Sequence, residues 1–82
     1  MKPKYNIRGG REMKEITSNM AGNVWKILVN VGEEIEAEQE VVILESMKME
    51  IPIESEDSGK VTEIKVKEGD FVNEGDVLIT YE

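Results

Sequence analysis

Residues 41–53 read Val-Val-Ile-Leu-Glu-Ser-Met-Lys-Met-Glu-Ile-Pro-Ile, two apolar runs on either side of a lysine that is bracketed by methionines. Short apolar runs bounded by polar residues are typical of β-strands. The spacing between them predicts a tight hairpin with Met47 and Lys48 as its two-residue tip. Its register pairs the residues that would fill the core face: Ser46 with Met49, Leu44 with Ile51, and Val42 with Ile53.

This hairpin breaks two local rules at one place. Glu45 falls opposite Glu50, a like-charge pair that normally destabilises a sheet, and the tip lacks the glycine-containing dipeptide that tight hairpins prefer. Such departures are more frequent at functional sites than elsewhere, although a longer loop or a shifted register would remove both. Lys48 is therefore a candidate for modification.

An internal repeat sets the architecture. Sliding the chain on itself by 37 residues superposes these pairs: Gly22 and Gly59, Val24 and Val61, Ile27 and Ile64, Val29 and Val66, Gly32 and Gly69, Ile35 and Val72, Val42 and Ile79, Glu45 and Glu82. One repeat cannot bury its own apolar face, so the two should pack against each other. We predict an all-β fold, a flattened β sandwich or barrel (a barrel-sandwich hybrid) of two quasi-symmetric four-stranded halves.

The strands predicted from alternation and turn residues span 15–19, 24–29, 40–46, 49–54, 60–66 and 76–81, with short pieces near 35–38 and 71–73. Helix is not expected. The inward-facing candidates are Val24, Ile27, Val29 and Val31 in the first half and Val61, Ile64, Val66 and Phe71 in the second. Trp25 departs from its repeat partner Thr62, so it lies on the outer face or covers one end. Met20 is assigned to the core, with an approach to the hairpin as the alternative.

The composition limits the kinds of function that are available. A chain of 82 residues forms one small domain, and it contains neither cysteine nor histidine. The usual general base, thiolate and imidazole metal ligands, and nucleophile pairs are therefore missing, so we expect no catalytic residues, no metal site and no enzyme activity. No apolar stretch is long enough to span a bilayer. We expect a monomeric, cytoplasmic domain with no membrane or nucleic-acid partner.

Charge is divided unevenly along the chain. Residues 1–14 carry five basic residues and one acidic residue, a charge of +4, which leaves −12 on residues 15–82 out of the net −8. We predict that 1–14 is a disordered basic tail, either an expression leader before a native start at Met13 or a native extension, and that 15–82 is the domain. An acidic domain should repel nucleic acid and favour basic partner surfaces, or simply remain soluble.

Two further patterns have ordinary explanations. Glu36, Glu38 and Glu40 alternate as ligands for a hard cation would, but the spacing of a calcium loop is missing and a solvated acidic face is the favoured interpretation. Two glycine-containing stretches, Gly9-Gly10 and Asp57-Ser58-Gly59, precede no predicted helix and are interpreted as turns rather than phosphate loops.

The stretch Glu45-Ser46-Met47-Lys48-Met49-Glu50, with Met20-Ala21-Gly22-Asn23-Val24 upstream, resembles the biotinyl domain of biotin carboxyl carrier proteins and the minimal biotin/lipoyl attachment proteins. The resemblance covers about residues 16–82. Lys48 matches the biotinylated lysine. Related lipoyl domains usually carry Asp-Lys-Ala at this point, and many biotinyl domains have alanine where this chain has Ser46.

The resemblance implies a biotin carrier with the modified lysine at one end of the sandwich and the chain termini at the other. Biotin protein ligase would attach biotin to Lys48, and the domain would shuttle carboxyl groups between a biotin carboxylase and a carboxyltransferase. The residues expected to be recognised by the ligase are Met47, Met49, Ser46, Glu45 and Glu50. The alternatives are a lipoyl carrier, an acceptor of either biotin or lipoate, and a cofactor-free β-interaction module.

Overall fold

The computed structural model describes residues 13–82, which form eight β-strands. Their bounds are β1 (Lys14–Thr17), β2 (Gly22–Ile27), β3 (Glu34–Ile35), β4 (Glu40–Ser46), β5 (Met49–Glu54), β6 (Gly59–Ile64), β7 (Phe71–Val72) and β8 (Val77–Tyr81). These residues contain no helix. Consequently the described part of the chain has no helical segment of the length and apolarity needed to cross a membrane.

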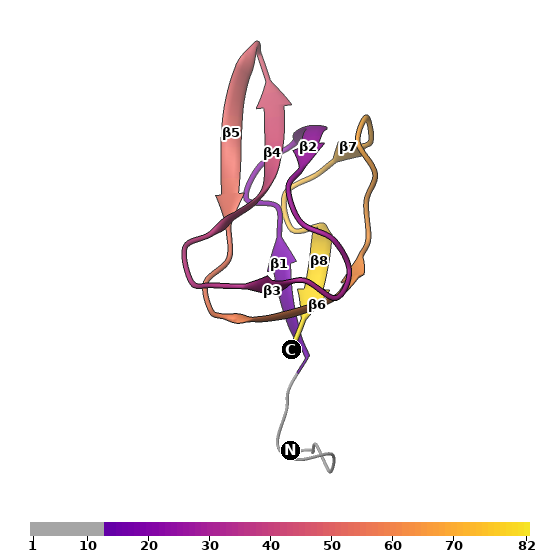
Figure 1. Ribbon diagram of the computed structural model, residues 1–82. Coiled ribbons are helices and arrows are strands. Elements are labelled where there is room, and N and C mark those ends of the chain that lie inside the picture. The colour runs from indigo at the N-terminus through magenta and orange to yellow at the C-terminus, as the bar shows by residue number, and fades with distance from the viewer. Residues whose placement is uncertain (1–12) are drawn as a thin grey trace.

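The strands form two four-stranded antiparallel sheets, ordered β1-β8-β6-β3 and β5-β4-β2-β7. The two orders are equivalent under the 37-residue repeat, because β6, β7 and β8 repeat β2, β3 and β4, while β5 repeats β1. In Figure 1 the β4–β5 hairpin extends from one end of the sandwich, and β1 begins beside the C-terminus at the other. The predicted sandwich of two quasi-symmetric halves is confirmed.

Backbone hydrogen bonds repeat with the same period. Gly32 N–H donates to the Val61 carbonyl at 2.8 Å, and Gly69 N–H donates to the Val24 carbonyl at 2.7 Å. Each of these two turns is therefore hydrogen-bonded to a strand from the other half of the chain. Both glycines have positive φ angles, 90° and 97°, in the left-handed region where a side chain is disfavoured.

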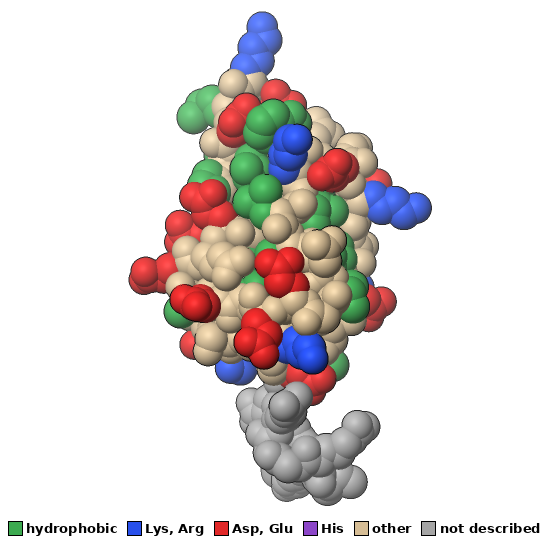
Figure 2. All heavy atoms as spheres, in the orientation of Figure 1, with side chains coloured by type: hydrophobic (Ala, Val, Ile, Leu, Met, Phe, Trp, Pro, Cys, Tyr) green, Lys and Arg blue, Asp and Glu red, His purple; other side chains and the backbone are tan. Residues whose placement is uncertain are grey.

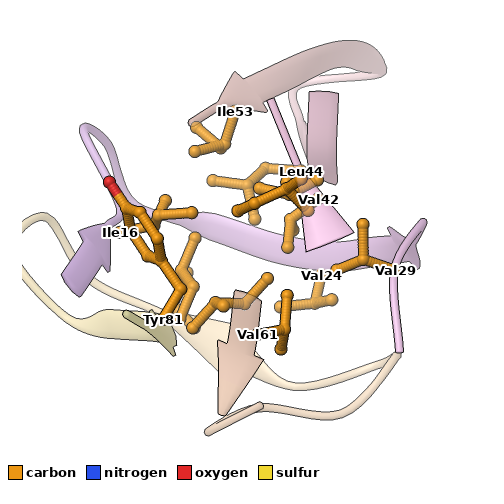
Figure 3. Packing of buried hydrophobic residues seen from close by; sticks show 13 residues of the cluster. Ile16, Val24, Val29, Val42, Leu44, Ile53, Val61 and Tyr81 are labelled. Carbon is orange, nitrogen blue, oxygen red and sulfur yellow. The ribbon is translucent and has the colours of Figure 1, made fainter. Parts of the chain in front are cut away.

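The core lies between the two sheets and draws equally on both. Val24, Val42 and Leu44 from one sheet meet Val61 and Tyr81 from the other in Figure 3, and all are buried. Burial of each aliphatic side chain contributes about 1.5–3 kcal/mol, which is the main stabilisation open to so small a domain. The remaining buried apolar residues are Ile16, Val29, Ile35, Val41, Ile53, Val72, Leu78 and Ile79.

A β-bulge explains why two adjacent residues are buried at the start of β4. The register between β4 and β5 shifts between Glu40 and Val42, so Val41 is an extra residue and turns inward beside Val42. The same bulge occurs between β1 and β8, where the extra residue is Leu78, the repeat partner of Val41. The bulge thus explains how β4 can contain the four consecutive apolar residues 41–44 and still have an outer side that faces solvent.

Two of the predicted inward residues were wrong. Val31 is 62% exposed because the strand ends at Ile27 and Val31 lies in the turn before Gly32. Phe71 is also 62% exposed, because strand alternation lets only one residue of β7 face inward and Val72 takes that position. Ile27, Ile64 and Val66 are only partly buried against the core.

The predicted strand bounds need small corrections. The strands expected at 15–19, 24–29 and 60–66 begin one or two residues earlier and end two residues earlier. The piece expected at 35–38 is only Glu34–Ile35, since the chain turns directly afterwards. The tail predicted for 1–14 falls mostly outside the described residues, and Lys14 is the first residue of β1. Gly9-Gly10 also lies outside them.

Candidate functional site

The β4–β5 hairpin holds the site predicted from the sequence. Its strands begin in the sandwich, where Val42 and Ile53 are buried partners, and continue outward to a tip formed by Met47 and Lys48. From Val42 to the tip the register is the predicted one: Leu44 faces Ile51, Glu45 faces Glu50 and Ser46 faces Met49. Lys48 is exposed, and Figure 1 shows the tip of the β4–β5 hairpin at the end of the molecule opposite the C-terminus.

The tip has an unusual backbone for its sequence. Met47 and Lys48 have φ angles of 53° and 66°, so both central residues of the two-residue turn are left-handed. This geometry matches the twist of a hairpin, but it normally selects asparagine or glycine. Neither side chain can hydrogen-bond to the adjacent backbone as asparagine can, so the left-handed conformation is costly at both positions. This cost indicates that Met47 and Lys48 are needed at the tip for a reason other than stability.

Glu45 and Glu50 are direct neighbours below the tip. Glu45 is half-buried and Glu50 is exposed, and neither forms an ion pair with Lys48 among the described residues. The like-charge pair expected from the sequence is therefore present. It costs a few tenths of a kcal/mol or more, which water and salt reduce at an exposed position.

The methionines flanking Lys48 are exposed rather than packed into the core. Met47 is 90% exposed and Met49 is 62% exposed. Met20 is partly buried against the core, and its methyl group lies near Gly22, where an added Cβ would also meet Ser46 Cβ. Met20 therefore fulfils both suggested roles, core residue and neighbour of the hairpin. In the view of Figure 2 hydrophobic side chains gather in the upper half of the molecule, below the tip.

The other described lysines lie in different surroundings. Lys14 and Lys65 form ion pairs with Asp57 and Glu63, at 3.5 Å and 3.1 Å. Lys26 Nζ lies 5.5 Å from the centre of the Trp25 ring. Lys60 is within β6, and Lys67 precedes the turn at Gly69. Among residues 13–82, Lys48 is the lysine at the tip of a two-residue hairpin.

The alternating glutamates do not form a ligand set. Glu36 and Glu38 lie in the turn between β3 and β4, and only Glu40 is in a strand. Within residues 13–82 no group of three or more acidic side chains is arranged to hold a metal ion. Asp57-Ser58-Gly59 leads into β6 rather than a helix, so it is a turn, as predicted.

This fold and tip agree with comparisons to known proteins. Residues 14–81 match the biotin/lipoyl family model, described as biotin-requiring enzyme. The chain belongs to the biotin/lipoyl attachment family. It is 64% identical over 64 residues to the biotin/lipoyl attachment protein of Bacillus subtilis, spanning 78% of this chain and 88% of that protein.

Other relatives in the biotin/lipoyl attachment family carry different names. The biotin carboxyl carrier protein of Streptococcus mutans is 48% identical over 61 residues, 74% of this chain and 47% of its own length. The acetyltransferase component of the Azotobacter vinelandii pyruvate dehydrogenase complex, named for its dihydrolipoyllysine residue, is 43% identical over 61 residues, 74% of this chain and 10% of its own length. The urea carboxylase structure from Kluyveromyces lactis superposes with a TM-score of 0.81 at 33% identity, covering 96% of this chain and 7% of that chain.

Family membership implies a covalently bound biotin or lipoyl group. The described residues fit such a group, because Lys48 offers an exposed amine on a protruding tip. Lys48 is exposed, and the paired strands β4 and β5 carry the tip. Attachment domains carry a group and do not catalyse its reaction. The absence of histidine and cysteine from the sequence is consistent with that role.

Proposed function

We propose that this protein is a biotin carrier in which biotin protein ligase attaches biotin to Lys48. The observation that carries the proposal is the tip itself. Lys48 is the second residue of a two-residue turn, both turn residues are left-handed, and the methionines on either side are exposed. Stability alone would favour glycine or asparagine at these positions.

The protein does not modify itself in this proposal. A lysine amine in water is protonated at pH 7 in all but about one molecule in a few thousand. The ligase therefore supplies the deprotonating environment and the activated biotinyl-adenylate. Lys48 Nζ attacks the acyl carbon, AMP leaves, the amine loses its proton and an amide remains.

The fold then determines how the modified lysine is used. Lys48 would hold biotin, which would supply the transfer of a carboxyl group from a biotin carboxylase to a carboxyltransferase. Lys48 holds the group at the far end from Tyr81 and Glu82, on a hairpin anchored by the buried pair Val42 and Ile53. A rigid domain keeps the arm from collapsing into its own core, and tethering raises its effective concentration at each active site.

Intact-mass measurement tests this proposal. The protein is produced in a host with active biotin and lipoate ligases, and its peptides are then mapped. Biotin mass on Lys48 is the expected result. Lipoyl mass would support the lipoyl alternative, and the absence of both after ligase and cofactor are added would leave a cofactor-free interaction module.

The lipoyl alternative has specific support, because two relatives, of 43% and 41% identity, are named for a dihydrolipoyllysine residue. The Met47→Asp and Met49→Ala double variant changes the tip toward the pattern of lipoyl domains. If the methionines direct biotin attachment, the biotin-transfer rate of purified ligase falls while the fold is retained, since both side chains are exposed. Unchanged rates would show that recognition lies elsewhere, with Ser46, Glu45 and Glu50 the next residues to replace.

A further inference from the structure

The part of the β4–β5 hairpin that carries Lys48 projects beyond the repeat. The last strand pair common to both halves is Leu44 with Ile51 in the hairpin and Tyr81 with Lys14 in the second half. Residues 45–50 continue past this point, and we call them the extension. Strand β2 pairs with β4 only as far as Glu45. Ser46 and the tip therefore lie beyond their last pairing with β2.

Met20 lies beside the base of this extension. A Cβ added to Gly22 would be 3.5 Å from Met20 Cε and 3.5 Å from Ser46 Cβ, so these two side chains border the space that glycine leaves open. Gly22 is buried, and Met20 is partly buried against the core. The side chain of Met20 therefore connects the core to the extension at Ser46, two residues before Lys48.

The loop that carries Met20 has an equivalent in the other half of the repeat, with the same hydrogen bonds. The Ser18 hydroxyl donates to the Met20 carbonyl, and the Ser55 hydroxyl donates to the Asp57 carbonyl at 2.6 Å. The N–H of each serine also donates to the carbonyl of the residue before β8 or β4, respectively, at 2.8 Å and 2.9 Å. The loop conformation is thus the same with methionine or aspartate at this position.

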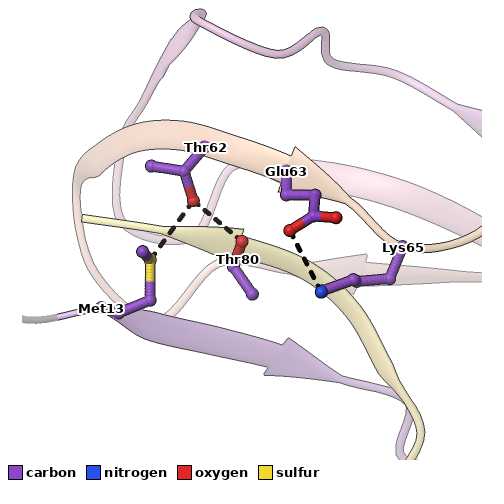
Figure 4. Close-up of polar contacts among 5 residues, drawn as sticks. All are labelled: Met13, Thr62, Glu63, Lys65 and Thr80. Atoms are coloured by element: carbon purple, nitrogen blue, oxygen red, sulfur yellow. Dashed lines mark hydrogen bonds and ion pairs between the residues drawn. The ribbon is translucent and has the colours of Figure 1, made fainter.

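The end of the sandwich opposite the tip, which we call the second pole, is held by polar contacts. Asp57 and Lys14 form their ion pair between side chains that are 61% and 42% exposed. The Thr62 hydroxyl donates to Met13 Sδ at 3.3 Å, so the residue before Lys14 also rests on β6 (Figure 4). Here the chain has no extension to support.

The tip end has apolar side chains at the positions of that ion pair. Met20 takes the place of Asp57 and Ile51 that of Lys14, and both are half-buried. The loop does not require this methionine, because the second pole forms the same loop with aspartate. A flexible thioether adapts to an irregular space, such as the one beside Gly22 and Ser46. The difference therefore belongs to the extension.

We propose that Met20 is a positioning residue for biotin transfer, an inference that rests on the proposed function. Its side chain braces the extension at Ser46 and so fixes where Lys48 stands when the ligase acts. Lys48 is exposed and forms no ion pair within residues 13–82, so its position depends on the hairpin that carries it. A misplacement of about 1 Å can lower a rate by on the order of 10²-fold.

NMR order parameters of the backbone amides test the brace in unmodified protein. Met20→Ala should lower the values of residues 46–49, because it leaves the space beside Gly22 unfilled. Met20→Leu keeps an apolar side chain of similar volume and should keep the parent values. Asp57→Ala is the matched control at the equivalent position of the second pole, and it should not change the extension.

Biotin transfer by purified biotin protein ligase measures the consequence, with the unmodified domain as the varied substrate and intact mass as the readout. Met20→Ala should lower kcat about tenfold or more and leave KM within about twofold, because Met47 and Met49 remain exposed for recognition. Met20→Leu should restore kcat. Asp57→Ala should match the parent in both constants.

Several results would overturn the positioning role. One is an unchanged kcat in Met20→Ala, and another is unchanged order parameters. A rise in KM alone would make Met20 part of the surface that the ligase binds. An equal loss of kcat in Asp57→Ala would ascribe the effect to general destabilisation. Thermal melting checks folding, and Met20→Val, which lacks the methyl group near Gly22, replaces Met20→Ala if that variant unfolds.

The failure of the proposed function would look different. If the parent acquires no biotin on Lys48, that function is overturned, while the order parameters still decide whether Met20 braces the extension. Normal biotinylation of the parent with the same kcat in Met20→Ala would overturn the positioning role alone.

Discussion

Glu38 occupies the position in the first half of the repeat that Gly75 occupies in the second. Both residues are left-handed, with φ angles of 70° and 93°. Glu38 N–H donates to the Ser55 carbonyl and Gly75 N–H donates to the Ser18 carbonyl, at 2.6 Å and 2.8 Å. The turn geometry is therefore imposed by the repeat, and glutamate adopts it at a cost that glycine avoids.

Replacing Glu38 with glycine should stabilise the domain. Removal of the left-handed strain outweighs the extra freedom of glycine in the unfolded chain, with a net gain of about 1 kcal/mol. For a domain of this size that corresponds to a rise in Tm of about 4–8 °C, measured by circular dichroism.

The reciprocal change, Gly75→Glu, should lower Tm by a similar amount. An added Cβ at Gly75 would meet no atom within 4 Å, so the loss would reflect backbone conformation alone. Opposite shifts in the two variants are expected. A destabilised Glu38→Gly would show that the glutamate side chain makes a favourable interaction at this turn.

Gly32→Val and Gly69→Val should each destabilise the domain without preventing modification. Both positions are open to a side chain, so the cost is that of a β-branched residue at positive φ, about 1–3 kcal/mol. Thermal unfolding measures the loss, and labelling of Lys48 is measured well below the transition. Folded variants that could not be labelled would show that the ligase reads these turns.

Lys48→Arg should abolish labelling and leave Tm unchanged. Arginine keeps the charge and approximate length but stays protonated and forms no amide. Lys60→Arg, in β6, is the matched control and should be labelled normally. Biotin recovered on Lys26, Lys60, Lys65 or Lys67 of the Lys48→Arg protein would move the attachment site.

Changing the tip to asparagine and glycine, Met47→Asn with Lys48→Gly, should raise the free energy of unfolding by about 1 kcal/mol while removing the acceptor lysine. These residues suit a turn with two left-handed positions, and the present ones do not. Urea denaturation of this variant beside the parent gives the difference. Equal midpoints would mean that the hairpin tolerates Met47 and Lys48 without cost.

The hairpin from Val42 to Ile53 could be predicted from the sequence because two constraints coincide there, whereas the bulge at Val41 could not. Alternation fixes which of Leu44 and Glu45 faces inward, and a two-residue tip fixes the register, so each pair follows from one choice. The repeat likewise predicted which residues occupy equivalent core positions. Val24 and Val61, for example, are both expected to be buried if the two halves share one core, and both are.

Positions outside continuous alternation were harder to predict. Phe71 and Val72 are adjacent and both apolar, so hydrophobicity alone does not say which faces inward; the repeat pairs Ile35 with Val72 and would have decided it. The exposure of Trp25 depends on a bulge, which leaves no mark in the pattern of apolar residues. The left-handed backbone of Glu38 could have been found by its alignment with Gly75.

The pairing of β1 with β8 brings the two ends of the domain together at the position that is equivalent, under the repeat, to the β4–β5 hairpin. Lys14 lies opposite Tyr81 as Ile51 lies opposite Leu44, so β1 and β8 pair as β5 and β4 do but are not joined by a hairpin. Joining Glu82 to Met13 through a copy of Ser46-Met47-Lys48-Met49 would complete a circular molecule with an acceptor lysine at each pole. Opening that ring at the original tip would give a circular permutant whose modified lysine sits at the former ends.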